Sequence, residues 1–222
     1  MKLGQSSLPL NEDSKESEGK RELKNKITEI LKFIFFILLL PLFVASTVGF
    51  IKELENLPAG LSLFFQRGIL IYLLIHLFIY EPQPLYQYGQ NLVIAIFRFF
   101  APLVKVAPFF LPIYSIVILI LFYFFDLIFK SPSWENYFMF AFSFTLTMHM
   151  VFTAKALRAK DSNVVKPNYF FAMSIIYIVS VFLISLLFGL VSKDFSFPGF
   201  FDTTVAMTAD VYKTIFHQLF VP

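Results

Sequence analysis

Otherwise apolar stretches of this 222-residue chain contain ionisable side chains, among them Arg67, His76, Asp126 and His149. An ionisable group surrounded by apolar residues loses its hydration, so it needs a partner that offsets that cost. Such residues either clasp two elements together or mark a path for an ion, a proton or a polar substrate. They are the positions from which chemistry could start in this sequence.

Arg67 and Asp126 have opposite charges. Arg67 lies about one helical turn from the start of its apolar stretch and Asp126 about one turn from the end of its own, and in the topology given below both of these ends are on the outer side of the membrane. We therefore expect an ion pair between them, in which each charge lowers the cost of burying the other. The simplest role of this pair is a clasp between two helices. The alternative is a part in a substrate or ion pathway.

His76 and His149 also lie at a similar depth, well inside their stretches. If the two imidazoles face each other, they could relay a proton, bind a metal or hydrogen-bond to a quinone-like carbonyl. In the other interpretation, each imidazole bonds to a neighbouring helix or to a lipid headgroup. The sequence leaves both interpretations open.

Signatures of enzymes and of metal sites are absent from the sequence. The chain has no cysteine, no His-Glu-x-x-His pattern, no Gly-x-Ser-x-Gly and no phosphate-binding glycine loop. We therefore expect no catalytic residue, no metal and no cofactor. A nucleic-acid partner is also not expected, since no basic face with interleaved aromatic residues is present.

Composition indicates which elements carry these residues. Hydrophobic residues make up 58% of the chain and charged residues only 15%, too few to cover a surface that faces water. Apolar stretches long enough for a bilayer predict an all-α integral membrane bundle with five transmembrane helices, at about 27–51, 63–80, 108–130, 137–157 and 169–192. Together with their connections, they form a membrane domain over residues 27–192.

The segment between the second and third predicted spans is too long for a turn and carries Arg98 and Lys105. We interpret residues 91–101 as an interfacial or elbow helix whose cations stay at the lipid headgroups. A re-entrant hairpin over 91–107 is the less favoured alternative. Prolines at 102, 108 and 112 interrupt this region.

Small residues at helical spacing predict where helices approach closely. Ala45 and Gly49 form such a pair in the first span. A small and polar stripe around His149 in the fourth span consists of Ala141, Thr145 and Thr153. Ser185 and Gly189 form a small pair near the end of the fifth span.

Both ends of the chain differ from its middle. Residues 1–26 are polar and of mixed charge, which predicts a flexible tail. Residues 193–222 form an amphipathic segment, with Asp202 as a plausible helix N-cap and a helix from there to residue 220. Its apolar stripe is a candidate surface for docking a partner: Val205, Tyr212, Ile215, Phe216 and Leu219.

Lysine and arginine gather beside spans on the cytoplasmic side of a membrane. Placing the N-terminus in the cytoplasm puts most of the cations inside, and five spans then leave the C-terminal segment outside. The expected location is a bacterial inner membrane, with lipid and one or more membrane or envelope proteins as partners. The predicted function is a non-enzymatic polytopic subunit of a larger complex; the alternative is a small transporter or channel for lipid, ion or proton.

Overall fold

The computed structural model describes residues 12–78, 82–129, 134–160 and 167–220, and no strand occurs within these ranges. The helices are α1 (Glu12–Glu55), α2 (Ala59–Phe78), α3 (Gln83–Ile96), α4 (Ala101–Phe110), α5 (Ile113–Phe129), α6 (Glu135–Lys160), α7 (Pro167–Val191) and α8 (Phe197–Phe220). The all-helical class expected from the sequence is confirmed.

Four of these helices, α1, α2, α6 and α7, are long and apolar enough to cross a membrane, which indicates an integral membrane protein. They contain the first, second, fourth and fifth predicted spans, apart from a few end residues. The third corresponds to α5, which is apolar but has only 17 residues.

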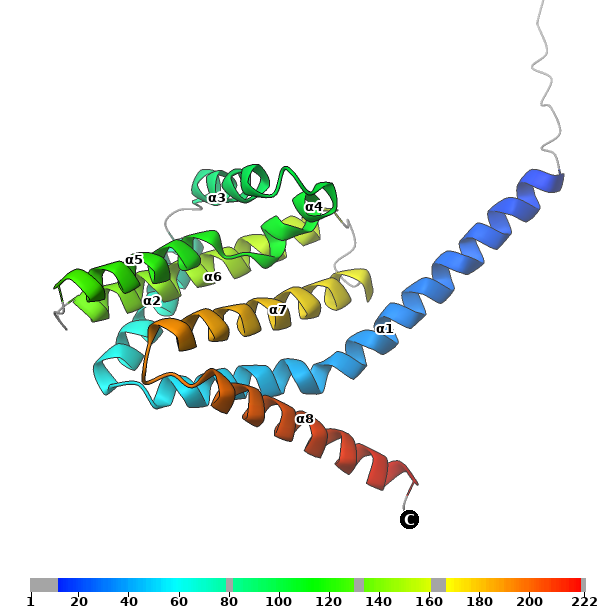
Figure 1. The fold of residues 1–222 in the computed structure, drawn as a ribbon. Coiled ribbons are helices and arrows are strands. Elements are labelled where there is room, and N and C mark those ends of the chain that lie inside the picture. Colours follow the sequence, from blue (N-terminus) through cyan, green and yellow to red (C-terminus); the bar gives the residue numbers. More distant parts are fainter. Residues whose placement is uncertain (1–11, 79–81, 130–133, 161–166, 221–222) are drawn as a thin grey trace, which may run out of the picture.

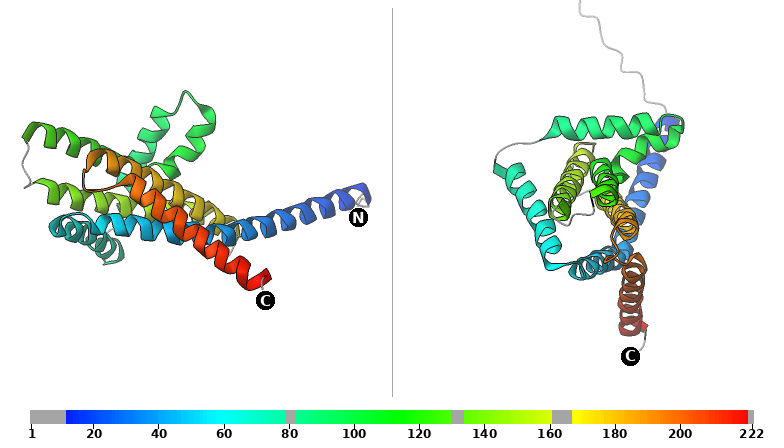
Figure 2. Two further views of the ribbon diagram at one scale, coloured as in Figure 1. Left: turned by 60° about the horizontal axis from the view of Figure 1, so that its bottom comes forward. Right: turned by 60° about the vertical axis from the view of Figure 1, so that its left-hand side comes forward.

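The bundle is built from two closely packed helix pairs, α1 with α7 and α2 with α6. Helix α5 packs on both α6 and α7, while α3 lies crosswise at the edge of the bundle against α5 and α6 (Figures 1 and 2). The largest core cluster forms where both pairs meet, around Phe142, Ile184, Phe188 and Phe200.

Helix α1 runs without interruption from Glu12 to Glu55. The prediction of a flexible tail over residues 1–26 is therefore wrong from residue 12 onward, and residues 1–11 lie outside the described part. Pairs such as Lys26 Nζ with Glu22 Oε1, 3.4 Å apart at i,i+4, support a helix even where no core covers it. A bend midway along α1 is visible in Figure 1, and Pro41 accounts for it by removing a backbone hydrogen bond.

The elbow consists of two helices, α3 and α4, rather than the single interfacial helix predicted over residues 91–101. The third span also starts later than predicted, at Ile113 instead of residue 108. The cause is Pro112, because the residue before a proline is pushed out of the helical region. Leu111 accordingly has an extended backbone, with φ −101° and ψ 107°, and separates α4 from α5.

Helix α8 begins at Phe197, so the suggested N-cap at Asp202 is wrong. The cap is Ser196, whose Oγ accepts a hydrogen bond from the backbone N–H of Gly199 at 3.0 Å. The helix also does not lie apart from the bundle as a surface element. It packs lengthwise against α1 over its first half, and its C-terminal half then leaves the bundle (Figure 1).

Candidate functional site

One face of α6 carries the polar contacts that hold the elbow to the bundle. Three of its positions, four residues apart, each bond to a different element. Thr145 Oγ1 lies 3.1 Å from Ser115 Oγ of α5, and Thr153 Oγ1 lies 3.1 Å from the Tyr86 hydroxyl of α3. Between them, His149 Nε2 lies 3.1 Å from the Phe109 carbonyl oxygen of α4. This is the stripe that the sequence predicts as a seam for helix contact.

The break between α4 and α5 explains why a histidine is needed there. A helix that ends inside a bundle leaves carbonyl groups without their usual partners, and apolar surroundings offer no water to replace them. Two side chains reach the carbonyls at the end of α4: His149 of α6 at Phe109, and Ser180 of α7, which donates to the Phe110 carbonyl at 3.1 Å. Since a carbonyl can only accept, His149 carries its proton on Nε2.

Tyr86 anchors the other half of the elbow. Gln90 Nε2 donates a hydrogen bond to the Tyr86 hydroxyl at 2.6 Å, and the same hydroxyl forms a second hydrogen bond with Thr153. Burial raises the pKa of Tyr86, against the lowering effect of these two hydrogen bonds, so the hydroxyl stays protonated at neutral pH. Tyr114 of α5 donates to the Leu85 carbonyl at 2.5 Å, which fixes the same helix from a second direction.

His76 lies in the same aromatic cluster as His149, but the two imidazoles do not touch. The His76 ring stacks on Tyr72 at 5.7 Å between centroids and meets the edge of Phe152 at 5.8 Å. His149 instead lies 6.2 Å from Tyr86, which stacks on Phe152 at 5.0 Å. Phe152 and Tyr86 therefore separate the histidines, and among the described residues the buried His76 Nδ1 has no hydrogen-bond partner.

The ion pair predicted between Arg67 and Asp126 is not formed. The Arg67 guanidinium lies over the Phe64 ring, 5.3 Å from its centroid, and its side chain is exposed. Asp126 borders a small hollow beside Trp134 and Glu135. Arg67 and Asp126 stay apart because α6 packs against both α2 and α5, which places the two residues at different helix interfaces.

Small residues allow the closest helix approaches. A Cβ added at Gly49 of α1 would lie 2.8 Å from Thr204 Oγ1 of α8, and one at Gly189 of α7 would lie 2.9 Å from Phe197 Cβ. The tightest approach was not predicted: a Cβ at Gly68 of α2 would lie 1.9 Å from Ser143 Oγ of α6. Its signal was a glycine inside an apolar span, next to Arg67.

The other predicted packing residues differ in burial. Ala45 and Ser185 are buried, and the Ser185 Oγ has no hydrogen-bond partner among the described residues. Ala141 is half-buried, and its carbonyl accepts a hydrogen bond from the Thr145 hydroxyl at 2.9 Å.

Glu53 is a buried charged residue that sequence reasoning missed. Only 7% of it is exposed, and its Oε2 accepts hydrogen bonds from the Ser196 backbone N–H at 3.0 Å and from Asn56 Nδ2 at 3.3 Å. It lies next to the acidic and polar residues of a connecting segment, where the sequence gives no sign of burial.

The predicted docking residues are all exposed on α8. Val205 is 48% exposed, and from Tyr212 onward the exposed fraction of these residues increases from 39% to 70% at Leu219. The Tyr212 hydroxyl donates to the Leu38 carbonyl of α1, and beyond this residue every position of α8 up to Phe220 is exposed.

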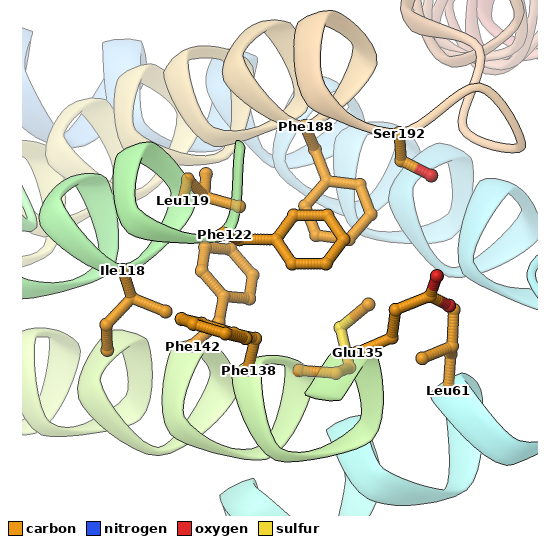
Figure 3. A pocket seen from close by; sticks show the side chains of 10 residues that line it. Leu61, Ile118, Leu119, Phe122, Glu135, Phe138, Phe142, Phe188 and Ser192 are labelled. Atoms are coloured by element: carbon orange, nitrogen blue, oxygen red, sulfur yellow. The ribbon is translucent and has the colours of Figure 1, made fainter. Parts of the chain in front are cut away.

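The polar seam leaves little space beside its side chains. The cavity beside His149 measures about 10 Å³, at the lower limit for one water molecule. A second cavity of about 30 Å³ lies between α2, α5, α6 and α7 and is walled mainly by Leu119, Phe122, Phe142 and Phe188, with Glu135 at one side (Figure 3).

Comparison of the chain with family models, curated proteins and solved structures found no match. Among the described residues no group of three His, Asp or Glu side chains is placed to hold a metal ion.

Proposed function

We propose that this protein is a non-enzymatic polytopic membrane subunit that acts by docking within a larger membrane or envelope complex. The observation that carries this proposal is the C-terminal half of α8. Beyond the contact of Tyr212 with α1, it leaves the bundle with an apolar stripe that nothing else in the described chain covers, formed by Ile215, Phe216, Leu219 and Phe220.

The state of the interior polar groups supports docking over chemistry. His149, Tyr86 and Thr153 are each engaged in hydrogen bonds that close the elbow, and the cavity beside them has no room for a substrate. A catalytic or transport residue would be expected to face a solvated or enlarged space.

The proposed topology has five spans in α1, α2, α5, α6 and α7, with the N-terminus in the cytoplasm of a bacterium and the bundle in its inner membrane. The cations near the start of α1 and near the end of α6 favour this orientation. Helix α5 is about 25 Å long at 1.5 Å per residue, somewhat shorter than the roughly 30 Å of bilayer hydrocarbon. The elbow that precedes it covers the rest of this distance.

The course of α8 changes the expected position of the C-terminus. Contacts from Glu53 to Ser196, from Gly49 to Thr204 and from Leu38 to Tyr212 follow α8 antiparallel along α1, from the outer end of that helix to its middle. We therefore propose that α8 returns through the bilayer beside α1 toward the cytoplasmic side, in addition to the five spans and in place of an extracytoplasmic surface position. Its docking partner would then be another membrane-spanning helix.

Charge on α8 supports a protein partner over lipid. Asp210 and Lys213 lie opposite the middle of α1, and their side chains are 76% and 79% exposed, 3.9 Å apart. A charged group facing hydrocarbon is costly even when paired. A helix with polar groups at this depth would relieve that cost.

Site-specific photo-crosslinking in the intact membrane tests the proposal. A crosslinker at Phe216 or Leu219 should give a discrete protein adduct, which the changes Ile215→Ser and Tyr212→Ser should reduce. The matched control is Leu121 on the exposed face of α5, which should give no adduct. Equal labelling at all three positions, without a discrete product, would contradict docking through α8.

A second candidate function is a small transporter or channel that uses Arg67, Asp126, His76 and His149. It is supported by the α4–α5 break inside the bundle, since broken helices occur at the substrate sites of transporters. Flux of ions, protons or lipids in liposomes that changes in His149→Ala and Asp126→Asn would favour it. Absence of flux across a broad panel would exclude it.

A further inference from the structure

The two helix pairs of the bundle leave a cleft between them. Helices α1 and α2 make few contacts with each other, as do α6 and α7, although the pairs α1–α7 and α2–α6 are closely packed. The space that results measures about 290 Å³ and is walled by Phe50 and Ile51 of α1, Ile69 of α2, Met150 of α6, and Val181 and Ile184 of α7.

The cleft wall offers almost nothing to a polar ligand. The hydroxyl groups that reach it are already bonded within the protein: Thr47 to Tyr177 at 2.8 Å, Thr147 to the Ser143 carbonyl at 2.8 Å, and Ser180 to the Phe110 carbonyl at 3.1 Å. A water molecule in a cavity needs two to four polar partners, so water is a poor occupant here.

Depth and access identify what can enter. The wall residues belong to the four helices that are long and apolar enough to cross a membrane, and the cleft extends from Ile51 near the C-terminal end of α1 to Met150 and Val181 near the middle of α6 and α7. Helix α5 covers the seam between α6 and α7, whereas the sparse contact between α1 and α2 leaves the other side open toward the bilayer.

We propose that this cleft binds a single hydrocarbon chain of a membrane lipid, which enters between α1 and α2. Its volume is close to the lower bound of small-molecule pockets, about 300 Å³, which suits one chain and excludes a headgroup. This inference requires insertion into the bilayer but is independent of docking through α8.

The test uses fluorescence quenching, which the single tryptophan of the chain makes practical. In a Trp134→Phe background, Ile69→Trp places a reporter on the cleft wall. Leu70→Trp, at a position 56% exposed, reports ordinary contact with lipid, and Phe200→Trp, at a fully buried position, reports a dry interior. Each variant is reconstituted in phosphatidylcholine vesicles with and without bromine on the acyl chain.

Brominated chains should quench the Ile69→Trp reporter at least half as strongly as the Leu70→Trp reporter, and should leave Phe200→Trp nearly unchanged. Filling the cleft with Thr147→Phe, or with Val181→Phe if the first variant does not fold, should lower quenching at position 69 severalfold but not at position 70. Quenching at position 69 as weak as at position 200, or unaltered by filling, would overturn the proposal.

Discussion

Glu53 Oε2 accepts a hydrogen bond from the backbone N–H of Ser196 at 3.0 Å, although the two residues are 143 positions apart in the chain. The bond joins the end of α1 to the start of α8. A carboxylate at a helix N-terminus satisfies an otherwise unpaired N–H and interacts favourably with the helix dipole. This contact therefore sets where α8 begins its course along α1.

Removing this carboxylate should loosen α8. We expect Glu53→Ala to lower the free energy of unfolding in detergent by about 1–3 kcal/mol, because the hydrogen bond that the buried Glu53 carboxylate accepts from the Ser196 N–H is lost. The matched control is Glu55→Ala, two residues further on, where the side chain is exposed and little change is expected. Equal effects of both substitutions, measured by thermal or denaturant titration, would contradict the proposed clasp.

Two glycine-to-alanine substitutions should have opposite effects. Gly68→Ala should destabilise the protein by about 1–3 kcal/mol, since the new methyl group would lie 2.4 Å from the backbone carbonyl oxygen of Phe140, which cannot rotate away. Gly19→Ala should be neutral or stabilising by up to about 1 kcal/mol, because nothing lies within 4 Å of its added Cβ on the exposed part of α1. Denaturant titration of both variants checks the sign.

The role of His149 as a cap on the broken helix can be separated from a role in chemistry. His149→Ala should cost about 1–3 kcal/mol of unfolding free energy, since the Phe109 carbonyl loses a buried donor. His149→Gln retains an N–H donor and should recover part of this loss. If His149→Ala and His149→Gln are equally stable, the hydrogen bond to Phe109 does not support the elbow.

Arg67 and Asp126 should behave as independent sites. Because no ion pair joins them, the effects of Arg67→Leu and Asp126→Asn on stability should add to within about 0.5 kcal/mol in the double variant. A coupling energy well above this value in the double-mutant cycle would show that the pair predicted from the sequence forms in the membrane.

The proposed return of α8 through the bilayer predicts which side of the membrane each end of this helix occupies. Since the chain has no cysteine, single cysteines can be placed at Ser17, Lys193 and Gln218 and labelled with an impermeant maleimide in vesicles of known orientation. Ser17→Cys and Gln218→Cys should react from one side and Lys193→Cys from the other. If Gln218→Cys reacts from the same side as Lys193→Cys, α8 lies on the outer surface and the proposed course is wrong.

The sequence was sufficient to predict the all-helical class and the apolar parts of α1, α2, α5, α6 and α7, because apolar length indicates them. It did not predict the start of α1 or the division of the elbow into α3 and α4. It also identified the stripe of Thr145, His149 and Thr153 as a seam, since small and polar residues recurred at helical spacing. Rotation about each helix axis could not be derived. Residues of equal depth, such as Arg67 and Asp126, therefore appeared as partners although α6 lies between their helices.

The sequence also could not predict which single charged residues are buried. Glu53 and Glu55 look alike in the sequence, yet one is 7% exposed and bonded to Ser196 while the other faces outward. The difference comes from the return of α8 to α1, a contact between distant parts of the chain. Amphipathicity predicted that α8 would form and which stripe would be apolar, but not the helix against which its first half packs.

The length of α1 has a mechanical consequence. Its 44 residues measure about 66 Å, roughly twice the thickness of bilayer hydrocarbon, so much of it projects beyond the bundle as a rod. A body attached near Glu12 would be held at a fixed stand-off from the lipid surface. The opposite end of α1 binds the start of α8 through Glu53. A tilt of the projecting part of α1 would therefore act on the position of α8.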